Sequence, residues 1–290
     1  MPTVAQWIEG ARPRTLPNAI APVLVGTGAA AAADGMVWWL AVLALMVSVS
    51  LIVGVNYAND YSDGVRGTDR VTVGPLRLVG SGLAAPEVVK KAAMSALAVA
   101  AVAGLALVVA SRMWWLLVPG ALCLVGAWFY TGGKRPYGYR ALGELAVFLF
   151  FGPVAVLGTM YVQAAEVNGT AIGCSVGVGA FSAAILVANN LRDIPTDSET
   201  GKRTLAVLLG DKDTRRLYLA LVTVPFLLTF LLGVKSTPAL AGLVAIPLLL
   251  PPARRVLRGY TGRRLIPVLR DTGMAMLAWS IATSLALALG

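Results

Sequence analysis

The sequence predicts an all-α membrane protein in which nine transmembrane helices form one bundle. Hydrophobic residues make up 58% of the 290 residues, and charged residues make up only 13%, which is about half the share in a typical soluble domain. The mean hydropathy is +0.77. Too little polar surface is available to coat a water-soluble protein of this length, so lipid must solvate much of the chain.

Nine apolar runs are long enough, or nearly long enough, to cross a bilayer as helices. Their high content of Gly, Ala and Pro is typical of helices that pack closely in lipid. In chain order, the predicted spans are residues 16–33, 37–57, 92–110, 114–130, 142–163, 171–188, 217–234, 239–252 and 272–289.

The segment before the first span predicts a short interfacial helix within residues 1–15. Thr3 and Gln6 have the spacing of a capping box, in which each side chain accepts a hydrogen bond from the other residue's backbone. Val4, Trp7 and Ile8 share one apolar face of that helix, which suits the membrane surface.

The positive charges predict the orientation of the bundle. Of the 24 Lys and Arg residues, 22 lie in linkers on one side of the predicted spans, and only Arg112 and Lys235 lie on the other. The positive-inside rule therefore places the N-terminus and four long linkers in the cytoplasm. Because the net charge of +10 is explained by this topology, nucleic-acid binding is not expected. The basic side comprises residues 1–15, 58–91, 131–141, 189–216 and 253–271.

Two residue types narrow the chemistry. Histidine is absent, which excludes histidine metal sites, catalytic triads with histidine and histidine pH switches. Cys123 and Cys174 lie in apolar runs without ligand spacing, so we expect them to be packed as small hydrophobic residues.

Two similar polar motifs follow the second and the sixth predicted spans. In each motif an Asn is followed by an Asp four residues later and by another Asp after seven or eight residues, a spacing that keeps the polar groups near one helical face. Carboxylates at the edge of the hydrocarbon are costly unless a cation compensates them. The first motif contains Asn56, Asn59, Asp60 and Asp63, and the second contains Asn189, Asp193 and Asp197.

This pair of motifs predicts a Mg²⁺ site that binds a diphosphate. Oxygen ligands without His or Cys favour Mg²⁺, which usually bridges to substrate phosphates instead of sitting in an all-protein cage. A lone Asp or Arg here would more simply be a solvated loop charge, but a doubled motif is not explained in that way. The nearby cations expected to complete the site are Arg66, Arg77, Lys134, Arg135, Arg192, Lys202 and Arg203.

Two other classes of membrane protein fit the sequence less well than a diphosphate-binding enzyme. Asp60-x-x-Asp63-Gly64 begins the signature of CDP-alcohol phosphotransferases, but Gly67-Thr68 breaks it. An ion-coupled transporter would carry ionisable residues near the centres of its spans. Here the carboxylates lie at the cytoplasmic ends of the spans, which favours capture of a metal-bound diphosphate.

Further motifs point to a known family. Together with residues 56–63, the sequence resembles the UbiA superfamily of intramembrane prenyltransferases, and within it the 1,4-dihydroxy-2-naphthoate polyprenyltransferases of menaquinone synthesis. The resemblance covers the chain to about residue 215 and is looser over the last three spans. The motifs are ARPRTLP at 11–17, GPLRLVGS at 74–81, YTGGKRPYGY at 130–139, LGE at 142–144 and GKRTLA at 201–206.

The resemblance implies one UbiA-type helical domain over residues 1–290, in a bacterial cytoplasmic membrane, with active-site loops at 58–91, 131–141 and 189–216. It implies Mg²⁺-dependent transfer of a polyprenyl group from polyprenyl diphosphate to 1,4-dihydroxy-2-naphthoate, with decarboxylation to demethylmenaquinone. Other aromatic acceptors of the superfamily, 4-hydroxybenzoate and haem or chlorophyll precursors, stay open as alternatives.

The resemblance also assigns roles to residues. Asn56 and Asn189 would contact substrate, and Arg12, Arg135 or Arg192 would pair with the acceptor carboxylate. The third Asp of the first family motif is replaced by Gly67, so Asp69 is either a displaced ligand or a loop charge. The expected metal ligands are Asn59, Asp60, Asp63, Asp193 and Asp197.

An allylic cation needs walls that exclude water and are rich in electrons. The aromatic residues expected there are Tyr57, Tyr61, Tyr137, Tyr139 and Phe148. Without histidine, a protein base must be Asp, Tyr or Lys, unless the diphosphate takes the proton. Glu144 either orients a basic partner or interacts with the dipole of the helix that it begins.

Overall fold

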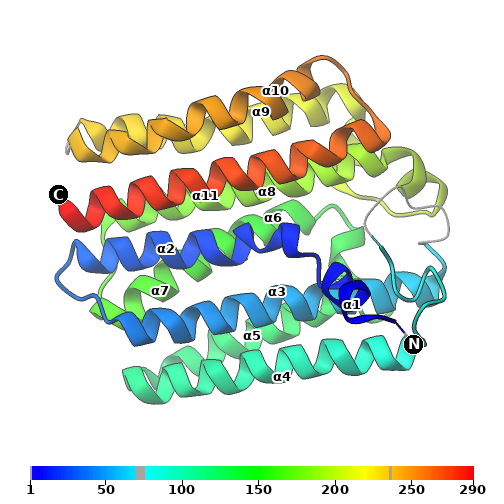
Figure 1. Ribbon diagram of the computed structural model, residues 1–290, viewed down its shortest axis with the longest axis horizontal. Coiled ribbons are helices and arrows are strands. Elements are labelled where there is room, and N and C mark those ends of the chain that lie inside the picture. Colours follow the sequence, from blue (N-terminus) through cyan, green and yellow to red (C-terminus); the bar gives the residue numbers. More distant parts are fainter. Residues whose placement is uncertain (1, 69–75, 235–236) are drawn as a thin grey trace.

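The computed structural model describes residues 2–68, 76–234 and 237–290, and within these ranges its regular elements are helices, with no β-strand (Figure 1). Asp69 lies outside the described residues. The prediction of an all-α fold is confirmed, and the long helices run roughly parallel to one another as a bundle.

Each predicted span has a helical counterpart. Of the described helices, seven are long and apolar enough to cross a membrane, while α2 and α5 are shorter. The counterparts are α2 (Pro17–Ala31), α3 (Trp38–Arg66), α4 (Pro86–Ser111), η2 with α5 (Trp114–Leu116, Leu117–Phe129), α6, η4 and α7 (Gly143–Leu149, Phe150–Val154, Ala155–Ala164), α8 (Gly169–Glu199), α9 (Leu205–Gly233), η5 with α10 (Thr237–Ala245, Ile246–Leu257), and η6 with α11 (Gly262–Leu265, Ile266–Leu289).

Two helices continue well beyond the predicted spans, and this changes where the motifs lie. α3 extends to Arg66 and α8 extends to Glu199, so both Asn/Asp motifs lie on final helical turns and not in loops. The apolar pattern ends where each helix leaves the hydrocarbon, whereas backbone hydrogen bonding continues into the polar region. α3 is capped by Gly67, whose left-handed φ of 73° glycine adopts more readily than residues with a side chain.

α8 is the central helix of the bundle. In its most apolar stretch 78% of the residues are buried within the protein, against 22–39% for the other six long helices. Its close neighbour η4 is a π-helical turn that contains Pro153, which lacks an N–H and cannot continue the α-helical pattern. A Cβ on Gly179 would lie 2.8 Å from the carbonyl oxygen of Phe148 in α6, so the backbones of α6 and α8 approach closely because glycine is present.

The N-terminal helix α1 (Val4–Gly10) confirms the predicted capping box. The Thr3 N–H donates to Gln6 Oε1 at 2.8 Å, and the Gln6 N–H donates to Thr3 Oγ1 at 3.3 Å. Trp7 packs edge-on against Tyr57 of α3, and its carbonyl accepts the Tyr57 hydroxyl. α1 therefore lies against α3 at the end of the bundle that carries the first motif, and the C-terminus lies at the opposite end (Figure 1).

Candidate active site

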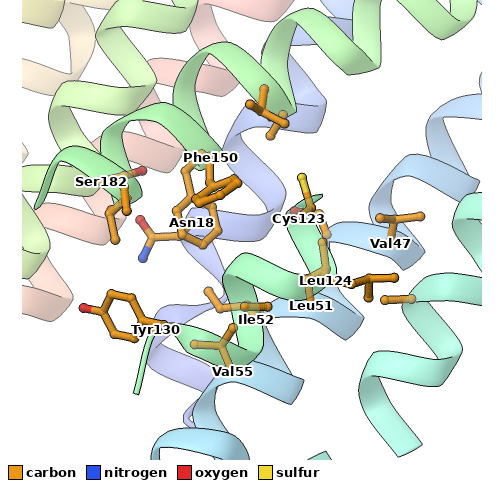
Figure 2. A pocket seen from close by; sticks show the side chains of 18 of the residues that line it. Asn18, Val47, Leu51, Ile52, Val55, Cys123, Leu124, Tyr130, Phe150 and Ser182 are labelled. Atoms are coloured by element: carbon orange, nitrogen blue, oxygen red, sulfur yellow. The ribbon is translucent and has the colours of Figure 1, made fainter. Parts of the chain in front are cut away.

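A cavity of about 930 Å³ joins the two motifs to an apolar chamber. Its lining follows α3 from Ala44 to Asp63, a length of roughly 28 Å at the rise of an α-helix. Figure 2 shows part of the apolar wall, where Leu51 and Ile52 of α3 face Leu124 of α5. The polar lining is concentrated at the motif end and comprises Arg12, Asn56, Asn59, Asp63, Arg77, Asn189, Asn190, Asp193, Asp197 and Lys202.

Asp63 is the buried carboxylate at the centre of this charged end. The Tyr139 hydroxyl donates a hydrogen bond to its Oδ1. Arg77 Nη2 lies 3.5 Å from Asp63 Oδ2, and Lys202 Nζ lies 3.6 Å from Oδ1. A buried carboxylate needs such compensation because desolvation of an unpaired charge is strongly unfavourable.

The second motif reaches the same cavity from α8. The buried Arg192 guanidinium donates to both Asp193 oxygens, at 2.7 and 2.6 Å, and to Asn189 Oδ1 at 3.0 Å. Arg192 does not itself line the cavity, so it orients the two residues that do. Lys202 connects the motifs, because its backbone N–H donates to the Asp197 carbonyl while its ammonium group approaches Asp63.

Asp60 lies only three residues from Asp63 but faces away from the cavity. It is 1% exposed, and its two oxygens accept the backbone N–H groups of Leu78 and Val79 at 2.7 and 3.0 Å. Gly64 allows this contact, since a Cβ there would lie 2.4 Å from Val79 Cγ1. Asp60 therefore fastens the segment 76–81 onto α3, and the same segment carries Arg77 to Asp63.

Four of the cations expected at the diphosphate, besides Arg192, lie outside the cavity. Arg66 donates to the carbonyls of Thr131 and Gly133 and lies over the Tyr139 ring at 5.4 Å. Lys134 and Arg135 are exposed and outside the cavity. Arg203, also exposed, is outside it too. Among the predicted cations, the cavity receives Arg12, Arg77 and Lys202.

Asn56 ties the N-terminal segment to the site. Its amide donates to the Ala11 carbonyl and to Thr15 Oγ1, both at 2.9 Å. Arg12, between these partners, has a left-handed φ of 55°, which is uncommon for a residue with a side chain. This arrangement brings Arg12 to the cavity wall.

The aromatic walls differ in part from those predicted. Tyr137 and Tyr139 line the cavity as expected, but Tyr57, Tyr61 and Phe148 do not. Tyr61 instead stacks on Trp128. Burial raises the pKa of Tyr137 to about 12, and burial together with Asp63 raises the pKa of Tyr139, so both hydroxyls stay protonated at neutral pH.

Sequence reasoning missed Tyr130, Phe150 and Asn190 as cavity residues. Figure 2 shows Tyr130 and Phe150 on the wall near Asn18. Tyr130 is the first residue of the motif at 130–139, and Asn190 follows Asn189 of the second Asn/Asp motif, so both lie within or beside motifs that the sequence revealed. Glu144, buried at the start of α6, accepts the Asn190 amide at 2.8 Å, a partner that the sequence did not indicate.

Comparison with known proteins identifies the family. Residues 19–284 match the UbiA prenyltransferase family. The chain belongs to this family.

Two UbiA family relatives cover most or all of the chain. A protein of Mycobacterium tuberculosis named 1,4-dihydroxy-2-naphthoate octaprenyltransferase is 59% identical over 290 residues, which is 100% of this chain and 99% of that protein. The Escherichia coli protein of the same name is 36% identical over 282 residues, covering 92% and 89% of the two chains. This chain is accordingly a transferase of the prenyltransferase type and a multi-pass membrane protein.

A solved structure shares the UbiA fold. The UbiA homolog from Archaeoglobus fulgidus bound to GPP and Mg²⁺ has a TM-score of 0.69, covers 98% of this chain and 99% of its own, and is 16% identical in sequence. At that identity the likeness extends to the fold alone.

The donor set at the charged end fits a hard divalent cation. Within the described ranges, no three Asp, Glu or Cys side chains lie close enough to hold a metal by themselves. Both motif helices nevertheless bring amide and carboxylate oxygens to the cavity, Asn59 and Asp63 from α3 and Asn189, Asp193 and Asp197 from α8. Mg²⁺ suits such a site, because water and substrate phosphates complete its coordination.

Proposed function

We propose that this UbiA family protein transfers a polyprenyl group from polyprenyl diphosphate to 1,4-dihydroxy-2-naphthoate, with release of diphosphate and of the carboxylate as CO₂, to give demethylmenaquinol, the reduced form of demethylmenaquinone. One observation carries the proposal: a cavity with two Asp motifs at one end and a long apolar chamber behind them. The 59% identity to a naphthoate octaprenyltransferase supports this choice of acceptor.

The proposed location is the bacterial cytoplasmic membrane, with the charged end in the cytoplasm. Water-soluble groups, including the diphosphate and the naphthoate carboxylate, would then reach the site from the cytoplasm. The polyprenyl tail would lie in the apolar chamber, which is lined by α3, α4, α5 and α7.

We propose Asn59 and Asp63 of α3, with Asp193 and Asp197 of α8, as the residues that hold Mg²⁺. When bound, the metal neutralises charge on the diphosphate as the allylic C–O bond breaks. Asp60 supports the site by a different route, because both of its oxygens already accept backbone N–H groups. Asp69, outside the described residues, has no role in this proposal.

The chain's cations and phenols perform the remaining tasks. Arg77 and Lys202 supply positive charge to the diphosphate oxygens, as preorganised groups that stabilise the developing negative charge. Arg12 at the cavity wall pairs with the acceptor carboxylate. Tyr130, Tyr137 and Phe150 shield the allylic carbon from water until it bonds to the ring.

The proton released from the ring has a limited choice of acceptors. With no histidine in the chain, the base is a cavity carboxylate, tyrosine or lysine, or the departing diphosphate. Tyr137 and Tyr139 are poor bases at neutral pH because their raised pKa values keep them protonated.

The test is prenyl transfer by the purified protein with a polyprenyl diphosphate, Mg²⁺ and a panel of aromatic acceptors, followed by mass spectrometry. We expect a prenylated, decarboxylated naphthalene product from 1,4-dihydroxy-2-naphthoate. Prenylation of 4-hydroxybenzoate in its place would refute the choice of acceptor but leave the reaction type standing. Absence of any transfer would refute both.

Removal of the metal is a second test. EDTA should abolish transfer, and added Mg²⁺ should restore it, because Arg77 and Lys202 alone do not compensate the diphosphate charge beside the cavity carboxylates. Alanine substitutions of Asp63, Asp193 and Asp197 should each lower the rate by about 100-fold or more. Full activity in two of these three variants would contradict the proposed metal site.

A further inference from the structure

A second hollow opens on the charged end of the molecule, outside the main cavity. Three arginines contribute to it, together with one exposed leucine. We call it the arginine groove, and its lining residues are Arg135, Pro136, Tyr139, Arg140, Gly201, Arg203 and Leu208.

The backbone holds these arginines in place. Arg140 and Arg203 pair in a parallel β-bridge, and the Arg203 N–H donates to the Tyr139 carbonyl at 3.1 Å. Arg66 binds the carbonyls of Thr131 and Gly133, which precede Arg135 in the same loop. Two loops from distant parts of the sequence are therefore joined so that their guanidinium groups line one hollow.

The charges in the groove are not balanced by the part of the protein that the structure describes. Arg135, Arg140 and Arg203 make no ion pair with an acidic side chain there, whereas Arg215 and Arg216 are paired with Asp211 and Asp213. Grouped like charges repel one another unless an anion is shared between them. Guanidinium groups suit phosphate because their paired N–H donors match its oxygens.

Tyr139 links the groove to the reaction site. Its ring lines the groove, its hydroxyl binds Asp63 in the cavity, and Lys202 lies 4.7 Å above the ring. The cavity and the groove are therefore neighbours that share Tyr139.

We propose that the arginine groove is a second site for a phosphate-bearing anion, separate from the metal-dependent site. Two sources share this chemistry: inorganic diphosphate and the headgroup of an anionic phospholipid. The contact through Tyr139 favours inorganic diphosphate, and this identification of the anion rests on the proposed function, which releases diphosphate in each turnover.

The experiment compares two variants with the same loss of charge. The groove variant combines Arg135→Gln, Arg140→Gln and Arg203→Gln. The control variant combines Arg254→Gln, Arg258→Gln and Arg263→Gln, which remove three exposed arginines at the end of α10 and in η6 that do not line the groove. Inorganic diphosphate is titrated calorimetrically into each full-length protein in a neutral detergent, with EDTA present to suppress metal-dependent binding.

We expect the groove variant to bind diphosphate at least about tenfold more weakly than the wild type, because it loses several charge-assisted contacts. The control variant should stay within about twofold, because its three arginines lie outside the groove. It loses the same net charge as the groove variant, so a general effect of charge would weaken binding in both. Arg135→Gln alone, at an exposed side chain, provides a milder variant if the triple substitution impairs folding. Size-exclusion profiles and thermal unfolding check each protein.

A parallel titration with short-chain phosphatidylglycerol identifies the source of the anion. Loss of diphosphate binding in the groove variant alone supports a product site, and loss of lipid binding in that variant alone supports a headgroup site. Equal binding of both ligands by the groove and control variants would overturn the proposal. No turnover is measured, so failure of the naphthoate assay would refute the proposed function without affecting this result.

Discussion

Asp60 and Asp63 show how two similar carboxylates, three residues apart, take different roles. Asp63 faces the cavity, where two cations and a phenol surround it. Asp60 faces the segment 76–81 and accepts two backbone N–H groups. Three residues turn the helix by about 300°, so the two side chains point about 60° apart, and one motif supplies both a proposed ligand and an anchor for the segment that carries Arg77.

Substitution of each by asparagine separates these roles. Asp63→Asn should raise the Mg²⁺ concentration needed for half-maximal transfer by about tenfold or more, because a metal ligand loses its charge. Asp60→Asn should leave that concentration within about twofold. It should instead lower stability by about 1–3 kcal/mol, since one backbone N–H would face an amide donor.

Mg²⁺ titration of the transfer rate compares the metal requirement of the two variants, and thermal unfolding compares their stability. If Asp60→Asn shifted the Mg²⁺ requirement as much as Asp63→Asn, Asp60 would be a metal ligand and the anchoring role would be wrong.

For single residues, the sequence predicted which segments supply the site, but it did not predict most of the contacts that each side chain makes. Asp63, Asp193 and Asp197 reach the cavity as expected from their spacing. The partners of Asp60 are 18 and 19 residues away, and Arg66 binds a loop 65 residues away. Helical periodicity gives the face of a residue but not the loop that later folds against it.

Among the elements, the contact between α6 and α8 depends on glycine. A Cβ at Gly179 would meet the Phe148 carbonyl at 2.8 Å, whereas a Cβ at Gly173, on the same helix, would have nothing within 4 Å. Both positions are helical, so alanine has the same intrinsic effect on helix formation at each. The difference in stability between the two alanine variants therefore measures the effect of the close backbone contact at Gly179.

Gly179→Ala should destabilise the protein by about 1–3 kcal/mol, the usual range for overpacking. Gly173→Ala should be neutral or stabilising by up to about 1 kcal/mol, because alanine favours helix. Thermal unfolding in detergent measures both. Equal effects of the two substitutions would show that the backbones do not approach as closely as described.

Hydropathy predicted where helices lie, but it did not predict where they end or where their backbone departs from the α-helix. All nine apolar runs became helical, but the ends of α3 and α8 lie nine and eleven residues beyond the predicted ends, at Arg66 and Glu199. Polar residues that face the interior of the bundle look like loop in a hydropathy pattern. The π-helical turn at Phe150–Val154 had only Pro153 as a signal.

For the whole molecule, the predicted orientation in the membrane makes a test possible. Alkaline phosphatase joined after Gly290 should be active, because nine crossings from a cytoplasmic N-terminus end outside the cytoplasm. Joined after Arg258, at the end of α10, it should be inactive. A fluorescent protein, which matures in the cytoplasm, should give the opposite pattern. Activity after Arg258 with none after Gly290 would reverse the topology.

The position of the C-terminus has a practical consequence for attaching this protein to a surface. α11 has 24 residues and ends one residue before the chain does, so it separates Gly290 from the charged end by roughly 36 Å. A sensor chip that captures the protein through a C-terminal tag would therefore leave the cavity and the arginine groove facing the flowing solution. An N-terminal tag would lie beside α1, at the end of the bundle that carries the first motif (Figure 1).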